Sequence, residues 1–419
     1  DRGGDRGGDR RGGRMTALRM ERDPVRIGWA RVASAVRPGA GGAAGALRLV
    51  DDAAPELPGP DWVRIRPRLA GICGSDLATV DGRSSRWFEP VVSFPFVPGH
   101  EVVADHPDGH RVVLEPVLGC VARGLAPCPA CAEGHLGRCD RLAEGHLAPG
   151  LQTGFCCDTG GGWSTEMMAH PSQLHEVPGE LRDADAVMVE PTACAVHAAL
   201  RGGVGRTDTV AVIGAGTLGL LTVAALARWS APHHLVVAAK HPQQESWAAR
   251  LAGSATTLTV CEPSAAARAV RRATGTRMVG TPGRDHLRLG GGADVTFDCV
   301  GSPESLATAL DLTRPGGRVV LVGMPAPANV DLTPLWQREI ELRGAYAYGT
   351  EQVDGTTVRT FDLAAELVAA HRLGDLVTAA YPLARHAEAL RHAAEAGRRG
   401  AVKVAFAPAA GPHEKATLP

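Results

Sequence analysis

A glycine-rich turn between an apolar strand and an apolar helix is the feature that most constrains how this chain of 419 residues folds. The strand predicted over residues 209–213 runs into Gly214, and the helix predicted over residues 220–228 follows. Gly214 allows a tight turn, Gly216 lets the backbone approach a pyrophosphate, and Gly219 lets helix and strand pack closely. The phosphates would lie at the helix N-terminus. In this context the glycine spacing predicts a dinucleotide site, with cofactor contacts at Gly214, Gly216, Thr217, Leu218 and Gly219.

The pattern of apolar runs divides the chain into two domains of an α/β protein. Residues 15–192 are rich in Gly, Pro and short β runs such as Val63-Arg64-Ile65-Arg66 and Arg111-Val112-Val113-Leu114, which predicts a mostly β, barrel-like domain. Residues 193–334 alternate apolar strands with Ala-rich helices, as in a doubly wound parallel sheet. Residues 335–408 mix strand and helix, and we expect them to return to the first domain.

Composition excludes several kinds of partner. The formal net charge of −1 gives no global attraction to nucleic acid or acidic membranes, so small-molecule partners are expected. Residues 1–14 repeat Asp-Arg-Gly-Gly and are predicted to be a disordered tail, as residues 409–419 are at the other end. The first segment lacks the apolar core of a signal peptide, so a cytoplasmic protein is expected. Residues 209–227 are apolar enough to span a membrane, but their glycines favour a buried strand, turn and helix.

Two clusters of side chains have the chemistry of zinc ligands. A thiolate at Cys73, an imidazole at His100 and a carboxylate at Glu101 can hold Zn²⁺ at three points and leave a fourth position open for substrate. Four thiolates within twenty residues can instead close a tetrahedral, structural site. The prediction is therefore two zinc ions per chain. The members of the second cluster are Cys120, Cys128, Cys131 and Cys139.

The spacing in the second cluster leaves an alternative open. Seven residues separate Cys120 from Cys128, which is a long first loop. Loop closure becomes only slowly more costly with length, so four ligands are favoured. The alternative is that only three cysteines bind and Cys120 does not. The remaining cysteines have no metal-ligand spacing and are interpreted as small buried residues; they are Cys156, Cys157, Cys194, Cys261 and Cys299.

The sequence around the first cluster, Gly71-Ile72-Cys73-Gly74-Ser75-Asp76 and Gly99-His100-Glu101, resembles the zinc-dependent medium-chain alcohol, sorbitol and threonine dehydrogenases. The resemblance covers about residues 25–408. It implies a GroES-like catalytic domain, a Rossmann domain, and hydride transfer between an alcohol, polyol or sugar-like hydroxyl and NAD(P). It also implies that Ser75 passes on the alcohol proton and that Asp76 orients the metal-bound imidazole. A homodimer or homotetramer is expected.

The same resemblance adds a ligand candidate at the domain junction. The segment from Met188 to His197 is similar to one in which a Glu approaches the metal, which makes Glu190 a third or fourth ligand. Glu101 is then a secondary or exchanging ligand, and which of the two carboxylates is the resting ligand stays open. Cys194 is an alternative thiolate, although we expect it to lie deeper on a helix.

The second strand of the nucleotide domain, predicted over residues 235–239, bears on cofactor choice. NAD-binding proteins place an Asp or Glu at its end to accept from the ribose 2′-hydroxyl, whereas this chain has Ala239, Lys240 and His241. A cation there can pair with a 2′-phosphate, which predicts a preference for NADP. In the alternative interpretation Lys240 is solvated and Glu245 serves the ribose.

Three aromatic residues and two later turns complete the predicted site. Trp87, Phe88 and Trp163 are expected to line the substrate pocket, and Val300 and Gly323, which follow two predicted strands, to flank the nicotinamide. Two other functions are compatible with the same fold: a zinc-free quinone or enoyl reductase of the same superfamily, and a zinc- and nucleotide-binding protein without turnover. Neither explains an open zinc site beside a nucleotide.

Overall fold

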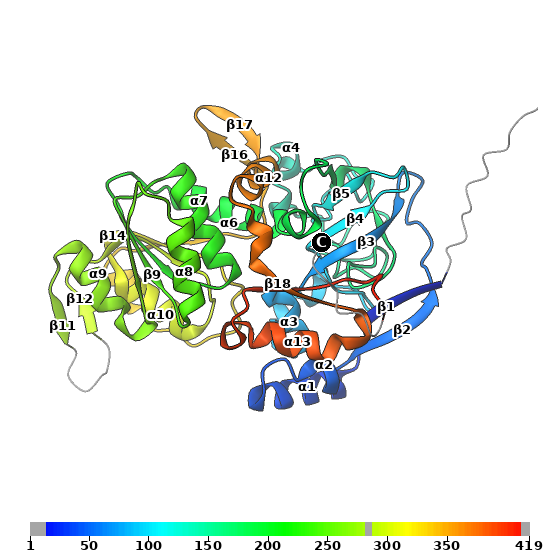
Figure 1. Ribbon diagram of the computed structural model, residues 1–419, viewed down its shortest axis with the longest axis horizontal. Helices are drawn as coiled ribbons and strands as arrows, with labels where there is room; N and C mark the ends of the chain where they lie inside the picture. Colours follow the sequence, from blue (N-terminus) through cyan, green and yellow to red (C-terminus); the bar gives the residue numbers. More distant parts are fainter. Residues whose placement is uncertain (1–13, 281–286, 412–419) are drawn as a thin grey trace, which may run out of the picture.

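The computed structural model describes residues 14–280 and 287–411, which form two lobes (Figure 1). One lobe is built on a six-stranded sheet in which all neighbouring strands are parallel. Its order is β10-β9-β8-β13-β14-β15, so the direction of winding reverses between β8 and β13, where such sheets bind nucleotides. The strands are β8 (Thr209–Ile213), β9 (His234–Ala238), β10 (Thr257–Cys261), β13 (Ala293–Asp298), β14 (Thr313–Leu321) and β15 (Glu341–Gly344).

The apolar stretch over residues 209–227 folds as the glycine pattern predicts. It becomes the fully buried β8, a turn, and most of α7 (Thr217–Trp229). No helix in the described ranges is long and apolar enough to cross a membrane. Helices cover both faces of the sheet, as its doubly wound order requires; they include α8 (Pro242–Leu251), α9 (Ala266–Thr274) and α10 (Pro303–Leu312).

The second lobe is a mostly antiparallel β structure with the order β18-β19-β3-β4-β5-β7. The predicted strands over residues 63–66 and 111–114 are present. The C-terminal segment contributes to this sheet, because β19 pairs with β3. The strands are β3 (Val63–Gly71), β4 (Val102–Asp105), β5 (Arg111–Leu114), β6 (Met167–Ala169), β7 (Leu174–Glu176), β18 (Val377–Tyr381) and β19 (Lys403–Phe406).

The domain boundaries differ from those expected. The parallel sheet continues past residue 334, because β15 pairs with the edge of β14. At the other boundary, α6 (Val189–Gly202) runs uninterrupted through residue 193. After β15 come the hairpin β16 (Thr350–Val353) and β17 (Thr356–Arg359), and then α12 (Thr360–His371), which lies near α6 between the lobes (Figure 1). The junction is thus a shared helical layer and not a linker.

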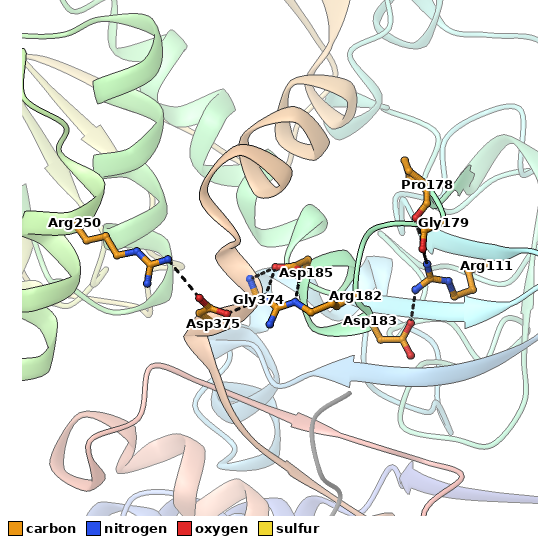
Figure 2. Close-up of polar contacts among 9 residues, drawn as sticks. All are labelled: Arg111, Pro178, Gly179, Arg182, Asp183, Asp185, Arg250, Gly374 and Asp375. Atoms are coloured by element: carbon orange, nitrogen blue, oxygen red, sulfur yellow. Dashed lines mark hydrogen bonds and ion pairs between the residues drawn. The ribbon is translucent and has the colours of Figure 1, made fainter.

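Polar contacts cross this junction as well (Figure 2). Arg250 on α8 lies 3.4 Å from Asp375, which also accepts from Arg182 at 2.8 Å. Asp185 accepts from the backbone of Gly374 at 2.8 Å. Because Arg182 and Asp185 belong to the barrel lobe, Asp375 is held from both sides.

The sequence interpretation did not predict a helical connection in the barrel lobe. β1 (Arg14–Met20) and β2 (Leu47–Ala53) pair along their full length, and between them lie α1 (Pro24–Val36) and α2 (Gly41–Ala44). The local signal was present, since Asp23 caps α1 and Pro24 occupies its first turn. The other elements are α3 (Gly74–Val80), α4 (Pro129–Ala132), α5 (Asp183–Ala186), α11 (Thr333–Gln337), α13 (His386–Ala394), β11 (Met278–Gly280) and β12 (Leu287–Leu289).

Substituting Gly219→Ala should destabilise the nucleotide-binding lobe. A Cβ at this position would overlap the carbonyl oxygen of Gly214, and backbone cannot move aside cheaply. We expect a loss of about 1–3 kcal/mol in unfolding free energy, typical of overpacking. Urea denaturation measures it, with Gly344→Ala as the control because a Cβ there meets nothing within 4 Å. Equal stability of the two variants would contradict this packing.

Candidate active site and zinc centres

Cys73 stands at the turn between β3 and α3. Its backbone N–H donates to Asp76 Oδ2 at 3.0 Å, which forms half of a capping box at the start of α3. The preceding residue, Ile72, is fixed by a bond from its N–H to Val404 O at 3.0 Å. The thiol is thus presented by a rigid strand-to-helix turn. Ser75, half-buried, lies in the first turn of the same helix.

The first predicted cluster is assembled in space. Ligand atoms of Cys73, His100 and Glu101 all lie within 4.8 Å of one another, and His100 and Glu101 are buried. His100 Nδ1 lies 3.4 Å from Asp76 Oδ1, yet these two buried atoms make no hydrogen bond. Asp76 therefore faces the imidazole in the way expected of a group that orients a ligand. A half-buried thiol beside a buried imidazole and a buried carboxylate, with unsatisfied polar atoms nearby, fits a bound cation.

Glu190, on the first turn of α6, lies at the edge of this cluster. Its Oε1 accepts from Tyr348 Oη at 3.1 Å and from Cys194 Sγ at 3.7 Å. Burial raises the pKa of Glu190 to about 7; His100 opposes this shift and Glu101 adds to it. Glu190 is not one of the three groups within 4.8 Å of one another. Cys194 was expected to lie deeper on its helix, but its thiol contacts Glu190 at the site.

A buried cation from the C-terminal strand also reaches this site. Lys403 on β19 forms an ion pair with Glu101 and donates to Ile72 O at 3.2 Å. A Cβ at position 71 would overlap Glu101 Oε2, so Gly71 makes room for that carboxylate. Neither Lys403 nor Tyr348 could be identified from the sequence, because each comes from a distant segment without a local motif.

The second cluster forms a separate lobe around four cysteines. Cys120 Sγ lies 3.7 Å from Cys139 Sγ, and all four sulfur atoms lie within 4.8 Å of one another. Tetrahedral ligands at a Zn–S distance of about 2.3 Å are separated by roughly 3.8 Å, so the arrangement fits a closed zinc site. Cys120 is within the group, as the four-ligand interpretation requires.

The long loop between Cys120 and Cys128 is held by a buried arginine. Arg123 donates to Leu118 O at 3.1 Å and to Gly150 O at 2.7 Å, and it reaches three further carbonyls. Burial lowers the pKa of Arg123, and the nearby thiols oppose this. Its guanidinium thus ties the loop to five backbone carbonyls.

The glycine turn has the geometry that its sequence predicts. Gly214 adopts a φ of +90°, which a residue with a side chain rarely tolerates. A Cβ at Gly216 would meet nothing within 4 Å, so its surroundings are open to a ligand. Thr217 begins α7, and its hydroxyl donates to Val402 O at 3.2 Å, the residue before Lys403.

The two later turns meet at the same edge of the parallel sheet. Asp298 O accepts from Gly323 N at 2.9 Å, and its carboxylate accepts from Val300 N at 3.0 Å. Val300 is half exposed. The edge that carries Gly214 therefore also carries Val300 and Gly323, which gives the predicted cofactor residues one common surface.

The residues beyond β9 present a cation but no carboxylate at the strand end. Ala239 is buried, Lys240 is exposed, and His241 caps α8. Glu245 lies one turn into α8 and is exposed. The backbone N–H of Lys240 donates to Gln244 Oε1 at 2.9 Å, which fixes the start of this turn.

One pocket prediction is wrong. Trp163 is fully buried in the barrel core against Phe406, and its indole N–H donates to Gly71 O at 3.3 Å. Its role is to support the strand that leads to Cys73. Trp87 is exposed and Phe88 is half-buried, both in the 3₁₀ turn over Arg86–Val91. Of the five cysteines expected to be buried, only Cys156 is fully so.

An open thiol, imidazole and carboxylate site beside a nucleotide-binding sheet, with a separate four-cysteine lobe, defines a zinc-dependent dehydrogenase of two lobes. Comparison with known proteins agrees. Residues 59–179 match the alcohol dehydrogenase GroES-like domain and residues 217–365 match the zinc-binding dehydrogenase family. The chain belongs to the zinc-dependent medium-chain dehydrogenases.

The similar proteins include several named for polyols. The chain is 30% identical over 303 residues to a sorbitol dehydrogenase of Arabidopsis thaliana, covering 69% of this chain and 75% of that protein. It is 28% identical over 338 residues to a putative D-xylulose reductase of Agrobacterium fabrum, covering 77% and 84%. The crystal structure of 2R,3R-butanediol dehydrogenase from Bacillus subtilis superimposes with a TM-score of 0.65 at 21% identity, covering 94% and 99%, which supports the fold.

Substituting one ligand in either cluster should remove the zinc ion of that cluster and leave the other zinc ion bound. We expect about two zinc ions per purified chain, and about one in either Cys73→Ser or Cys131→Ser. Only Cys131→Ser should lower the melting temperature strongly, because a closed zinc site contributes folding free energy. Elemental analysis and thermal denaturation test this, with Cys157→Ser as the control outside both clusters. A wild-type content below two would reopen the ligand assignment.

Proposed function

We propose that this protein oxidises a secondary hydroxyl of a polyol or sugar-like alcohol by hydride transfer to a nicotinamide nucleotide, or catalyses the reverse reaction. The observation that carries the proposal is the cluster of Cys73, after β3, with His100 and Glu101, before β4, together with the glycine turn that begins α7. The names of the relatives support a polyol as the substrate class.

Cys73 and His100 are the groups we assign to the catalytic metal, with Glu101 in the same cluster and Glu190 at its edge as the two candidate carboxylate ligands. When bound, zinc would supply a Lewis acid that lowers the pKa of the substrate hydroxyl. Ser75, two residues after Cys73, would accept the released proton at its hydroxyl oxygen and pass it towards solvent. Asp76 would hold the imidazole in one orientation. Ala78, buried on α3, offers no second proton carrier.

We infer that the glycine turn, Val300 and Gly323 bind the nucleotide and that NADP is preferred over NAD. Lys240 is exposed at the end of β9, where a 2′-phosphate would lie, and no carboxylate occupies that strand end. Solved structures similar to this chain include one bound to NADP and one complexed with NADH. Because similar structures bind either nucleotide, the proposed preference for NADP rests on the charge of Lys240.

The cofactor preference can be measured with two variants. Wild-type kcat/KM should be higher with NADP⁺ than with NAD⁺, and Lys240→Ala should lower that ratio about tenfold, the effect of one charge-assisted hydrogen bond. Glu245→Gln is the control, and it should leave the ratio unchanged. A wild-type preference for NAD⁺ that Glu245→Gln abolishes would support the alternative in which Glu245 binds the ribose.

The role of Ser75 can be separated from metal binding. With sorbitol, xylitol or 2,3-butanediol as substrate, Ser75→Ala should lower kcat by roughly 10²-fold, as the loss of a proton-transfer group does. Its zinc content should not change. Ser84→Ala is a matched control, because that serine is also half-buried but bonds Thr79. The zinc-free reductase alternative would be favoured if the protein oxidises none of these alcohols and the zinc-depleted protein reduces quinones.

A further inference from the structure

The hairpin between β4 and β5 carries a third group of metal-ligating side chains. His106, Asp108 and His110 each offer a nitrogen or oxygen atom, and these atoms lie within 4.8 Å of one another. The group follows β4, which begins at Val102, directly after Glu101. At about 3.4 Å per residue, this length of extended chain places His106 roughly 17 Å from Glu101. The group therefore shares no member with the two zinc clusters and lies away from the catalytic one.

The sequence of this hairpin, His106-Pro107-Asp108-Gly109-His110, fixes the backbone of its tip. Gly109 N donates to His106 O at 2.9 Å, and His106 N donates to His110 O at 2.9 Å, which closes a tight loop. The ring of Pro107 presets its own φ. Gly109 has a φ of +91°, the left-handed conformation that ends such a loop. The two histidines are therefore held at opposite ends of one rigid turn.

The imidazole rings of His106 and His110 lie face to face. Their centroids are 4.4 Å apart, and their planes are inclined by 26°. Both side chains are half-buried. Within residues 14–280 and 287–411, the ring of His110 has no hydrogen bond or ion pair. Its nitrogen atoms are therefore free to bind a ligand, while stacking holds the ring in place.

His106 and Asp108 face each other with two electron-pair donors. His106 Nδ1 accepts from the backbone N–H of Asp108 at 3.2 Å, so this nitrogen carries its lone pair. Asp108 Oδ2 lies 3.4 Å from the same nitrogen. Nitrogen and oxygen ligands at about 2.0–2.1 Å from a tetrahedral zinc ion are separated by roughly 3.4 Å, so the spacing fits a shared ion. Asp108 is exposed, and water can bind its N–H when an ion takes this place.

The two arginines beside the hairpin are already paired with other carboxylates. Arg111 lies 2.7 Å from Asp183 (Figure 2). Arg68 lies 2.6 Å from the same carboxylate and 3.2 Å from Asp105. Among the residues that the structure describes, Asp108 has no Lys or Arg partner. Its negative charge at the tip therefore remains available to a cation.

We propose that His106, Asp108 and His110 bind one divalent transition-metal ion at the tip of this hairpin, in a third site that the proposed dehydrogenase reaction does not use. Imidazole suits zinc, nickel and copper, whereas calcium and magnesium prefer sites made of oxygen atoms. Three protein ligands leave the remaining positions of the ion to water. Because the site is at the surface, its ion exchanges with solution and should be lost on gel filtration, which leaves the two zinc ions of the purified chain.

Calorimetric titration of the zinc-loaded protein with Ni²⁺ tests the proposal. The wild type should bind one equivalent of Ni²⁺ without releasing zinc. His110→Gln should weaken binding by more than the roughly tenfold that loss of a supporting group costs a metal site, and Asp108→Asn should weaken it as well. His371→Gln is the matched control, because His371 is a half-buried histidine outside all three groups, and this variant should bind Ni²⁺ as the wild type does. Release of one zinc ion for each Ni²⁺ bound, or equal affinity of the wild type and His110→Gln, would overturn the proposal.

Retention on a column of immobilised Ni²⁺ supplies a second measurement that keeps nickel away from the buried zinc sites. The untagged, zinc-loaded wild type should elute later than His110→Gln and together with His371→Gln. Elution of all three proteins at the same position would contradict a site at the hairpin tip. Because the His110 ring makes no hydrogen bond within the described ranges, His110→Gln should keep the wild-type melting temperature, which thermal denaturation checks.

Discussion

The buried ion pair between Lys403 and Glu101 is the interaction on which the site depends. Both side chains are almost completely removed from solvent, and removing one partner of such a pair commonly costs about 3–5 kcal/mol because the other charge is left unpaired. The pair exists only because β19 returns to β3 from the far end of the chain. The same ammonium group binds Ile72 O, directly before Cys73. The metal site is therefore complete only when the C-terminal segment is in place.

The two lobes are joined at several points beside that pair. Thr217, at the start of the nucleotide-binding helix, bonds Val402 O, one residue before Lys403. Glu190 lies on α6, which crosses the domain boundary without a break. At the outer end of the junction, Asp375 lies between Arg250 and Arg182 (Figure 2). The last contacts are partly exposed and contribute little individually, whereas the Thr217 contact and α6 both lie directly beside the residues of the metal site.

The features that could be predicted from the sequence were those encoded locally. The glycine turn was predicted because strand, turn and helix are contiguous in the sequence. The four-cysteine cluster was predicted because its thiols lie within one segment, from Cys120 to Cys139. Lys403 and Tyr348 were not found, because they reach the site through pairing of distant segments. The prediction for Trp163 was wrong because an aromatic residue in a loop gives no indication of whether it packs in the core or lines a pocket. The helix α1 was missed although Asp23 and Pro24 mark its start.

Helix α3 links the catalytic cluster to the surface. Asp76, near its N-terminus, faces His100, and Asp81, at its C-cap, anchors Ser34 of α1. The helix has seven residues, so about 10 Å separates its two ends. A buried carboxylate is fixed at each end of this helix, so neither end can shift without breaking hydrogen bonds inside the protein. The carboxylate that faces His100 and the carboxylate that anchors α1 are therefore positioned by the same short helix.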